Sequence, residues 1–341
     1  MLILLIVYVC FCWLFLEAEL QCLRRQVTLS RRAAFAEGTN KNLMVQYRAF
    51  LLFCLYYNLP HLPTNADTVA LYVQFLKRTF VSMTSVKNYI NRAKTLHLTL
   101  GLPFPEADYS FRLLIKGLTR LHPHEEKRAL PITPVILLKL YDVMDLTQPL
   151  HASLWCCFLT AFFLFARKST MLPPTPATFS IRKHLTRGNF SRSEEGLLVL
   201  VKWSKTLQFG ERHLLVPLLV IPGSVLCPCR AFDHMVSLIP ADKLSPAFLH
   251  RVGTSWVSVG HTVFVNNLRA LLRLAGVDAR GYTGHSFRRG GASCAFDAGV
   301  SGELIKMHGD WRSDAYLKYL SVPMHQRAHV CHRMRRRILC P

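Results

Sequence analysis

Three side chains near the carboxyl end of the chain have the types and the spacing for chemistry on a phosphate group. His285 and Arg288 stand three residues apart, so a helix would place them on one face. The apolar pattern that follows predicts two short helices ending at Gly299 and Gly309, because glycine commonly terminates a helix. Tyr319 comes shortly after the second helix. We expect the imidazole, the guanidinium and the phenol to converge on one phosphate, although the first two alone would equally suit a helix cap and a surface charge.

This stretch resembles the active site of the tyrosine recombinases, the phage integrase-like family. The motifs that carry the resemblance are His285-Ser286-Phe287-Arg288, Ala298-Gly299 and the run GDWRSDAY, in the order and spacing of the family. Counted from the glycine of the third motif, Tyr319 holds the register of the nucleophile. The third motif is most similar to the eukaryotic mobile-element branch, the DIRS and Crypton type. The resemblance implies DNA cleavage through a 3′-phosphotyrosine intermediate, with neither a metal nor another cofactor.

The same resemblance implies two further catalytic positions. Arg167 follows an apolar helix predicted over residues 153–166, where the family has its first catalytic arginine. Lys205 lies in a turn between strand-like runs at residues 197–203 and 213–220, and it matches the lysine on the family's β-hairpin. The predicted catalytic set is therefore Arg167, Lys205, His285, Arg288, Trp311 and Tyr319.

Each of these side chains has a chemical reason to be present. The phenol of tyrosine has an ordinary pKa of about 10, so Tyr319 needs cationic neighbours to attack at neutral pH. Arg167 and Arg288 could hold the non-bridging phosphate oxygens and stabilise the transition state. His285 could hydrogen-bond the same phosphate or accept the proton of the tyrosine. In the family, the lysine that Lys205 matches gives a proton to the departing 5′-oxygen.

Departures from the family pattern support a second hypothesis, a DNA-binding protein derived from a mobile element that no longer cuts DNA. Thr170 stands where the family has a glutamate after its first arginine. Asp310 occupies the place of the family's histidine or tryptophan, and Trp311, one residue further on, is also typical of a core aromatic. Tyr316 lies about one helical turn before Tyr319, and we expect it to pack rather than to react.

The composition favours a nucleic-acid partner. The chain of 341 residues has 42 Lys and Arg against 20 Asp and Glu, a formal charge of +22 that is spread along its length. Such a charge is typical of proteins that bind a polyanion. The 11 cysteines form no framework of pairs, which favours a reducing compartment, and the lone Cys227-Pro228-Cys229 motif is interpreted as structural, so no metal site is predicted. We predict double-stranded DNA as the partner, a nuclear location and, from the resemblance, a homo-tetramer on two DNA sites.

Length and pattern predict two domains. The charged, proline-containing stretch HPHEEKRALPITP separates two helical blocks. We predict an apolar extension at residues 1–27, a helical core-binding module of the SAM-like type at 28–124, and a tyrosine recombinase-like catalytic domain at 125–341. The predicted fold class is mainly α with a small β-hairpin or sheet, an α+β fold. The short hairpin and the helical module favour a recombinase over a type IB topoisomerase, which would share the chemistry.

Basic residues off the apolar stripes of the first helical block are the predicted DNA contacts. The block contains four short helices, with predicted starts near Thr39, Asn65, either Ser82 or Thr84, and Phe111. The residues predicted to contact DNA are Lys41, Arg48, Lys87, Arg92 and, from the second block, Arg289. Each of them alone would equally suit a solvated face.

The chain begins with an uninterrupted apolar run at residues 1–16. A membrane helix needs about 17–25 such residues, and the run lacks the basic flank of a signal peptide. The arginines that follow it would suit a membrane anchor with a cytoplasmic body. We favour an extension without function over membrane contact through this run, which is the alternative.

Overall fold

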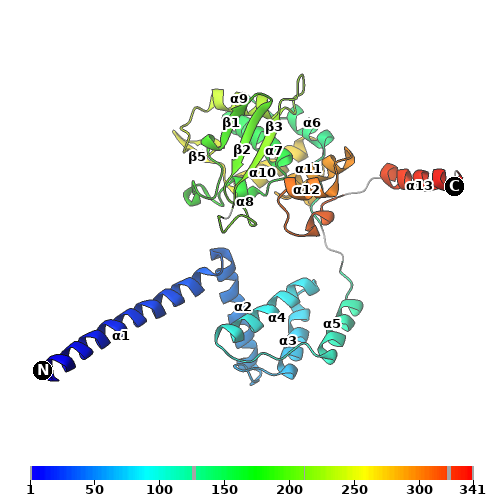
Figure 1. Cartoon of the computed structure of the whole chain (residues 1–341). Coiled ribbons are helices and arrows are strands. Elements are labelled where there is room, and N and C mark those ends of the chain that lie inside the picture. Colours follow the sequence, from blue (N-terminus) through cyan, green and yellow to red (C-terminus); the bar gives the residue numbers. More distant parts are fainter. Residues whose placement is uncertain (1, 125–127, 211, 321–323, 340–341) are drawn as a thin grey trace. The chain divides into compact units, whose positions relative to one another are not determined.

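The computed structural model describes residues 2–124, 128–210, 212–320 and 324–339 (Figure 1). The chain forms two compact units, residues 1–127 and 128–341. Helices predominate in the described residues, and the small antiparallel sheets lie in the second unit. This arrangement confirms the predicted mainly-α fold with a β-hairpin. The predicted boundary between residues 124 and 125 adjoins residues 125–127, which lie outside the described residues.

The first unit is helical throughout its described length. Its helices are α1 (Leu2–Ala33), α2 (Glu37–Tyr56), α3 (Ala66–Thr79), α4 (Met83–Thr99) and α5 (Tyr109–Leu121). Phe50, Tyr72 and Val86 belong to the buried core that joins α2, α3 and α4. Asn65 and Ser82 accept hydrogen bonds from backbone N–H groups in the first turns of α3 and α4, as predicted.

The predicted start of the first module helix is wrong. The helix α2 begins at Glu37, so Thr39 lies within it and does not cap it. Ala36 occupies the cap position and makes no side-chain cap hydrogen bond. Because no polar side chain marks this helix start, the sequence pattern favours the next suitable threonine instead.

The helix α1 is continuous through residue 27, where the sequence predicted an extension to end. Its side chains from residue 16 onward are exposed, including Leu16, Leu20 and Leu23. Among the described residues, no helix is long and apolar enough to cross a membrane. The side chains of residues 1–15 lie outside the description. Both predictions for the apolar run, an extension and a membrane anchor, therefore stay predictions.

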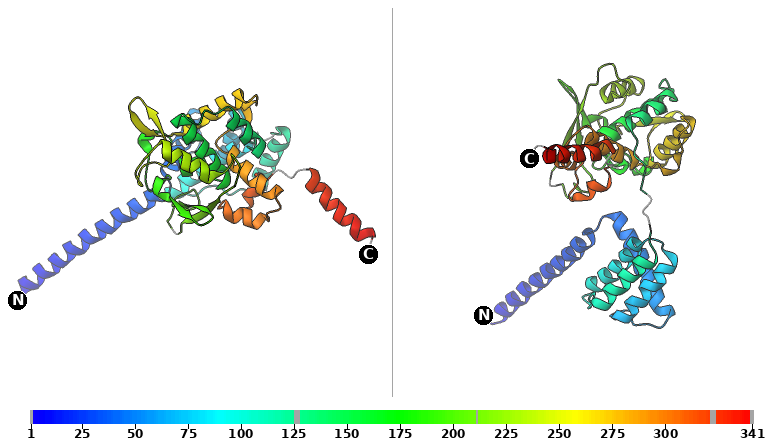
Figure 2. Two further views of the ribbon diagram at one scale, coloured as in Figure 1. Left: turned by 90° about the horizontal axis from the view of Figure 1, so that it is seen from above. Right: turned by 90° about the vertical axis from the view of Figure 1, so that its right-hand side faces the viewer.

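The second unit places a small sheet on one side of a group of helices (Figure 1 and Figure 2). Its helices are α6 (Pro134–Asp142), α7 (Pro149–Phe163), α8 (Lys168–Met171), α9 (Pro228–Leu238), α10 (His261–Leu274), α11 (Ser286–Asp297), α12 (Gly302–His308) and α13 (Met324–Leu339). The strands β1 (Phe190–Ser193), β2 (Gly196–Val201) and β3 (Leu214–Leu219) form one antiparallel sheet in that order. A separate hairpin pairs β4 (Leu249–Val252) with β5 (Ser255–Ser258).

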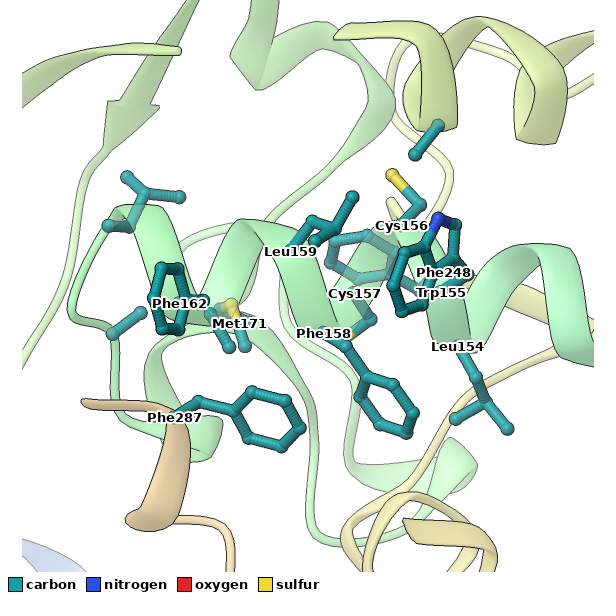
Figure 3. Close-up of a cluster of buried hydrophobic side chains, with 14 of the residues drawn as sticks. Leu154, Trp155, Cys156, Cys157, Phe158, Leu159, Phe162, Met171, Phe248 and Phe287 are labelled. Carbon is teal, nitrogen blue, oxygen red and sulfur yellow. The ribbon is translucent and has the colours of Figure 1, made fainter. Parts of the chain in front are cut away.

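The helix α7 is the buried centre of this unit. Every side chain from Ala152 to Phe162 is buried, which is typical of a helix covered on all sides and explains the absence of a polar stripe. Figure 3 shows this cluster, in which Phe158 stacks on Phe287 of α11 with ring centroids 4.9 Å apart. The packing fixes the end of α7 against the beginning of α11, and the candidate site lies where these two helices meet.

Two consecutive glycines allow α11 to approach its neighbours closely. A β-carbon on Gly290 would overlap the carbonyl oxygen of Ile132, and one on Gly291 would overlap that of Phe162 at the end of α7. The N–H of Ile132 also donates a hydrogen bond to the Ser286 carbonyl oxygen at 3.0 Å. The glycine pair therefore lets the backbone of α11 pack directly against two other backbone segments.

The predicted β-hairpin is confirmed, with shorter strands than the sequence indicated. β2 and β3 pair from Gly196 opposite Leu219 to Val201 opposite Leu214. Residues 202–213 connect them, of which residue 211 lies outside the described part, and Lys205 belongs to this connection. We call residues 202–213 the β2–β3 loop.

Candidate active site

Arg288 is the buried centre of the candidate site, with 2% of its surface exposed. Its Nη1 donates to the carbonyl oxygen of Phe165, and its Nη2 donates to that of Gly309 at 2.8 Å. The guanidinium carbon lies 3.6 Å from the centroid of the Trp311 ring. Within the described residues, the buried Nε has no hydrogen-bond partner. Burial and the charge of Arg167 lower the pKa of Arg288, but arginine keeps its proton at neutral pH, so the site holds a desolvated positive charge.

Arg167 is brought to this centre by an unusual end to α7. The chain leaves the helix through Phe165, whose φ of +46° is in the left-handed region. This backbone turn directs the Phe165 carbonyl at Arg288. Arg167 follows two residues later, half-buried at the first position before α8. The structure therefore brings together the two arginines that the sequence placed in one site.

His285 lies immediately before α11 with its side chain exposed at the surface. Partial desolvation lowers its pKa, and the charges of Arg167, Arg288 and Lys168 lower it further. The imidazole is therefore neutral at pH 7. A neutral imidazole can accept a proton or a hydrogen bond, which leaves open both functions that the sequence suggested for it.

The two candidate tyrosines have different surroundings. Tyr319, at the end of the 3₁₀ turn η4 (Asp314–Lys318), is half-buried, and its ring centroid lies 5.7 Å from the guanidinium carbon of Arg288. Tyr316 is buried, and its hydroxyl packs where a β-carbon on Gly302 would stand. Tyr319 thus lies beside the cationic centre at the edge of a small core, whereas Tyr316 is buried inside that core with Ile305 and Trp311.

Trp311 is both a core residue and a wall of the site. It is buried with Phe165, Ile305 and Tyr316, and the face of its ring covers the Arg288 guanidinium. α12 ends before Gly309, as predicted, but the left-handed residue there is Asp310, with a φ of +53°. Glycine is needed at 309 for a different reason, because a β-carbon there would overlap the Trp311 ring.

Lys205 is exposed on the β2–β3 loop. Its neighbours are tied to the turn that precedes Trp311: Ser204 Oγ donates to the Asp310 carboxylate at 3.2 Å, and the Thr206 hydroxyl donates to the same carboxylate. The loop that carries Lys205 is therefore attached to the segment that covers Arg288. Sequence reasoning treated Asp310 only as a departure from a family pattern and missed this function.

A second missed residue is Lys168, which directly follows Arg167. Its side chain is half-buried and packs against Gly284, where a β-carbon would overlap it. Burial lowers the pKa of Lys168, and the charge of Arg269 lowers it further. The signal in the sequence was a pair of adjacent basic residues after a buried helix. At the expected glutamate position, Thr170 is buried in α8, and its N–H donates to the Arg167 carbonyl at 2.9 Å.

The predicted DNA contacts of the first unit lie on α2 and α4. Lys87 lines a cavity of about 640 Å³ between α4 and α5. Arg92 instead lies near Tyr47, where burial raises the pKa of the tyrosine and the arginine partly offsets the rise. Lys41 and Arg48 are exposed on α2. The DNA contacts predicted for these four residues stay predictions.

The cavity beside Lys87 has basic residues that sequence reasoning missed. Arg112, Lys116 and Arg120 of α5 line it together with Lys87. The signal was their spacing of four residues, which places them on one face of a helix. We call these four residues the α4–α5 basic face.

Arg289 has a packing function in the structure. Its Nη1 donates to the Ala129 carbonyl at 2.8 Å, and its Nε is buried. Burial lowers the pKa of Arg289, and the charge of Arg128 lowers it further. The side chain thus fastens the segment that enters the second unit to α11, and the DNA contact predicted for it stays a prediction.

The cysteine motif fits the structural interpretation. Cys227 and Cys229 are buried; the Ile221 N–H donates to the sulfur of Cys227 at 3.3 Å, and the Cys229 thiol donates to the Leu218 carbonyl at 3.0 Å. In the part of the chain that the structure describes, no group of three or more His, Cys, Asp or Glu side chains is arranged to hold a metal ion.

Comparison with known proteins identifies a fold. The sequence matches no protein-family model and no curated protein. Among solved structures, the integrase of the Tn1549 transposon in complex with transposon right end DNA has a TM-score of 0.58 at 11% identity, covering 91% of this chain and 97% of that one. A lambda integrase dimer bound to a COC′ core site has a TM-score of 0.56 at 14% identity, covering 88% and 94%.

A third solved structure, the XerH site-specific recombinase bound to palindromic difH substrate, has a TM-score of 0.51 at 12% identity and covers 78% of this chain and 69% of that one. Likeness at such low identity is likeness of fold. The mostly helical architecture with small antiparallel sheets agrees with this fold. The chain has the fold of the tyrosine recombinases.

Proposed function

We propose that this protein is a site-specific DNA recombinase or integrase that breaks and rejoins DNA through a 3′-phosphotyrosine intermediate. The observation that carries the proposal is the position of Tyr319 beside the buried Arg288, with Arg167 close enough to lower the pKa of that arginine. A tyrosine hydroxyl becomes a useful nucleophile in such cationic surroundings. The same charges attract the phosphate that it would attack.

The proposed reaction assigns one task to each side chain. The Tyr319 oxygen attacks the phosphorus and loses its proton to His285 or to solvent. Arg167 and Arg288 bind the non-bridging oxygens, on which negative charge develops. The bond between phosphorus and the 5′-oxygen breaks, and Lys205 gives that oxygen a proton. The resulting phosphotyrosine keeps a phosphodiester-like bond, so a second DNA strand can reverse the step.

Double-stranded DNA is the proposed partner because charge and fold both support it. The formal charge is +22, and the similar solved structures include an integrase and a recombinase bound to DNA. A homo-tetramer on two DNA sites, a nuclear location and descent from a DIRS- or Crypton-type mobile element complete the proposal. These three parts rest on the sequence resemblance and on the absence of a cysteine framework.

The second candidate is a DNA-binding protein of the same fold that no longer cuts. The specific observation in its favour is that Arg288 donates from Nη1 and Nη2 to the Phe165 and Gly309 carbonyls. Two of the five N–H donors of the guanidinium are thus used within the protein, as expected where Arg288 has only a structural function. Thr170 also supplies no carboxylate beside Arg167.

A suicide substrate distinguishes the two candidates. In duplex DNA with a nick just beyond the cleavage site, cleavage frees a short strand that carries the 5′-hydroxyl. This strand diffuses away, so the phosphotyrosine bond cannot be reversed and a covalent adduct accumulates. We expect wild-type protein to form an adduct that survives denaturing gel electrophoresis. Tight DNA binding without an adduct on nicked libraries of varied sequence would favour the non-cutting candidate. A protein that neither binds DNA nor forms an adduct would contradict the proposal of a nucleic-acid partner.

A further inference from the structure

Asp310 links two parts of the candidate site that are distant in sequence. Its side chain is buried, with 7% exposed. Arg212 forms an ion pair with one carboxylate oxygen, and the hydroxyls of Ser204 and Thr206 donate to the other. These three partners all belong to the β2–β3 loop. One carboxylate therefore receives donors from both halves of that loop.

The contacts to Asp310 enclose Lys205 on both sides. Ser204 and Thr206 are its immediate neighbours, and they also contact one another, with their hydroxyl oxygens 2.8 Å apart. The Thr206 N–H donates to Ser204 Oγ at 3.1 Å, so the short turn is held internally as well. From the other side, Arg312 Nη2 donates to the Thr206 carbonyl at 2.7 Å. The backbone at Lys205 is thereby fixed to the segment 310–312.

The backbone conformation at Asp310 explains how one short turn contacts both the β2–β3 loop and Arg288. Its φ of +53° is left-handed, a conformation that Asp and Asn tolerate better than most residues. The carboxylate points to the β2–β3 loop, while the next residue, Trp311, covers Arg288. Burial alone would raise the pKa of Asp310, but hydrogen bonds from Thr206 and Arg212 outweigh it, so the pKa is lowered and the carboxylate is charged at neutral pH.

We propose that Asp310 is a positioning residue that holds the β2–β3 loop through Ser204, Thr206 and Arg212, and thereby sets Lys205 against the leaving 5′-oxygen. This inference rests on the proposed function, because it assigns Asp310 to the proton-transfer half of that reaction. The residue that departs from the family pattern would then be the one that orders the general acid.

The test compares DNA that has oxygen at the scissile 5′ position with DNA that has sulfur there. In both, the bond from Tyr319 to phosphorus forms as the bond to the 5′ atom breaks. The oxygen must take a proton to leave, whereas a thiol has a pKa of about 8.5 and leaves as the thiolate. A defect confined to proton donation therefore disappears with sulfur, and a defect in transition-state binding persists.

Asp310→Asn is the informative variant, because Asn also tolerates the left-handed backbone while the ion pair with Arg212 is removed. We expect it to slow adduct formation on the oxygen substrate by about 10- to 100-fold, within the usual contribution of a general acid. On the sulfur substrate its rate should return to near that of wild type. Thr206→Val, which removes one hydroxyl from the same contact, should show the same pattern to a smaller degree.

Three control variants accompany this test. Lys205→Ala should also be rescued by sulfur, and Arg288→Ala should be slow on both substrates. Asp314→Asn is the matched control, because Asp314 lies in the same segment but is exposed and pairs with Lys306 at 2.7 Å, away from the loop. It should behave as wild type on both substrates. Asp310→Asn that is equally slow on oxygen and sulfur would overturn the proposal.

A second readout does not depend on activity. In the free protein, Asp310→Asn should speed hydrogen exchange of the β2–β3 loop amides, and Asp314→Asn should not. Unchanged loop exchange in Asp310→Asn would overturn the positioning function even if the wild-type enzyme cuts DNA. If wild type cuts neither substrate, the proposed function and the catalytic part of this inference are both wrong, and the exchange result then decides only whether Asp310 orders the loop.

Discussion

The guanidinium of Arg288 lies over the ring of Trp311, with 3.6 Å between the guanidinium carbon and the ring centroid. Such a cation–π contact contributes about 2 kcal/mol when it is desolvated. It helps to keep a buried arginine in place within a site that also holds Arg167. The same guanidinium carbon lies 5.7 Å from the centroid of the Tyr319 ring. The position of Arg288 in the candidate site therefore depends on an aromatic face at residue 311.

The first prediction separates this aromatic face from simple packing. Trp311→Phe keeps a π face and Trp311→Leu removes it, while both shorten the side chain. We expect Trp311→Leu to lower the free energy of unfolding by about 1–2 kcal/mol more than Trp311→Phe, and to reduce adduct formation more strongly. Chemical denaturation and suicide-substrate kinetics measure the two effects. Equal losses in both variants would show that volume alone matters.

The second prediction uses two glycines in helices. A β-carbon on Gly290 would overlap the Ile132 carbonyl oxygen, whereas Gly117 of α5 has nothing within 4 Å of that position. Gly117→Ala should therefore stabilise its unit by up to about 1 kcal/mol through helix propensity. Gly290→Ala should destabilise the second unit by several times that amount, because the backbone of Ile132 must move. Differential scanning calorimetry that finds Gly290→Ala neutral would contradict the packing of α11.

The third prediction concerns acid stability. Burial lowers the pKa of His184 from 6.5 to about 4, with smaller contributions from His261 and Lys183. Its Nδ1 accepts a hydrogen bond from the Ser180 N–H at 3.0 Å, and protonation would remove that acceptor. His184 binds a proton more readily in the unfolded chain than in the folded protein. The contribution of neutral His184 to the free energy of unfolding is therefore complete above about pH 6.5 and is lost as the pH falls to about 4. Between these two pH values, the free energy of unfolding should fall by an amount on the order of 2–3 kcal/mol.

His184→Asn tests this assignment, because the asparagine carbonyl can accept the same hydrogen bond and does not titrate in this range. The variant should lose less stability than wild type between pH 6.5 and pH 4 in urea titrations. Identical pH profiles would assign the acid sensitivity to other groups, such as His250 and His261, whose pKa values burial also lowers.

The fold class and the placement of His285 beside Arg288 follow well from the sequence, because both depend on local patterns. The sequence of the buried α7 is strongly apolar, and the helix predicted over residues 153–166 overlaps most of it. His285 and Arg288 share one helix face by spacing alone. These signals need no knowledge of the rest of the chain.

Other features depend on contacts between distant segments, which spacing does not report. Asp310 stands in the sequence as a mismatch, and its function becomes visible only when Ser204 and Thr206 lie against it. Thr39 is a good capping residue by type, yet α2 begins before it and without a cap. The sequence also does not report that Arg289 Nη1 donates to the Ala129 carbonyl in a segment far away in sequence.

The fourth prediction concerns the α4–α5 basic face. Replacing Lys87, Arg112, Lys116 and Arg120 by Gln should weaken DNA binding and flatten its dependence on salt, by about 0.9 in the logarithmic slope for each phosphate that the variant no longer neutralises. The control changes Arg24, Arg25 and Arg32 to Gln on the exposed α1. Fluorescence anisotropy titrations at several salt concentrations measure both. Equal slopes in the two variants would place the DNA-binding surface elsewhere.

The identity of the nucleophile decides whether the proposed active site is correct. Wild type, Tyr319→Phe and Tyr316→Phe are each incubated with the nicked suicide substrate, and the modified peptide is located by mass spectrometry. Tyr319→Phe removes one hydroxyl beside Arg288, so it should bind DNA as wild type does but form no adduct, while Tyr316→Phe should still form one. The wild-type phosphotyrosine should map to Tyr319. An adduct that survives in Tyr319→Phe, or that maps to Tyr316, would contradict the proposed active site.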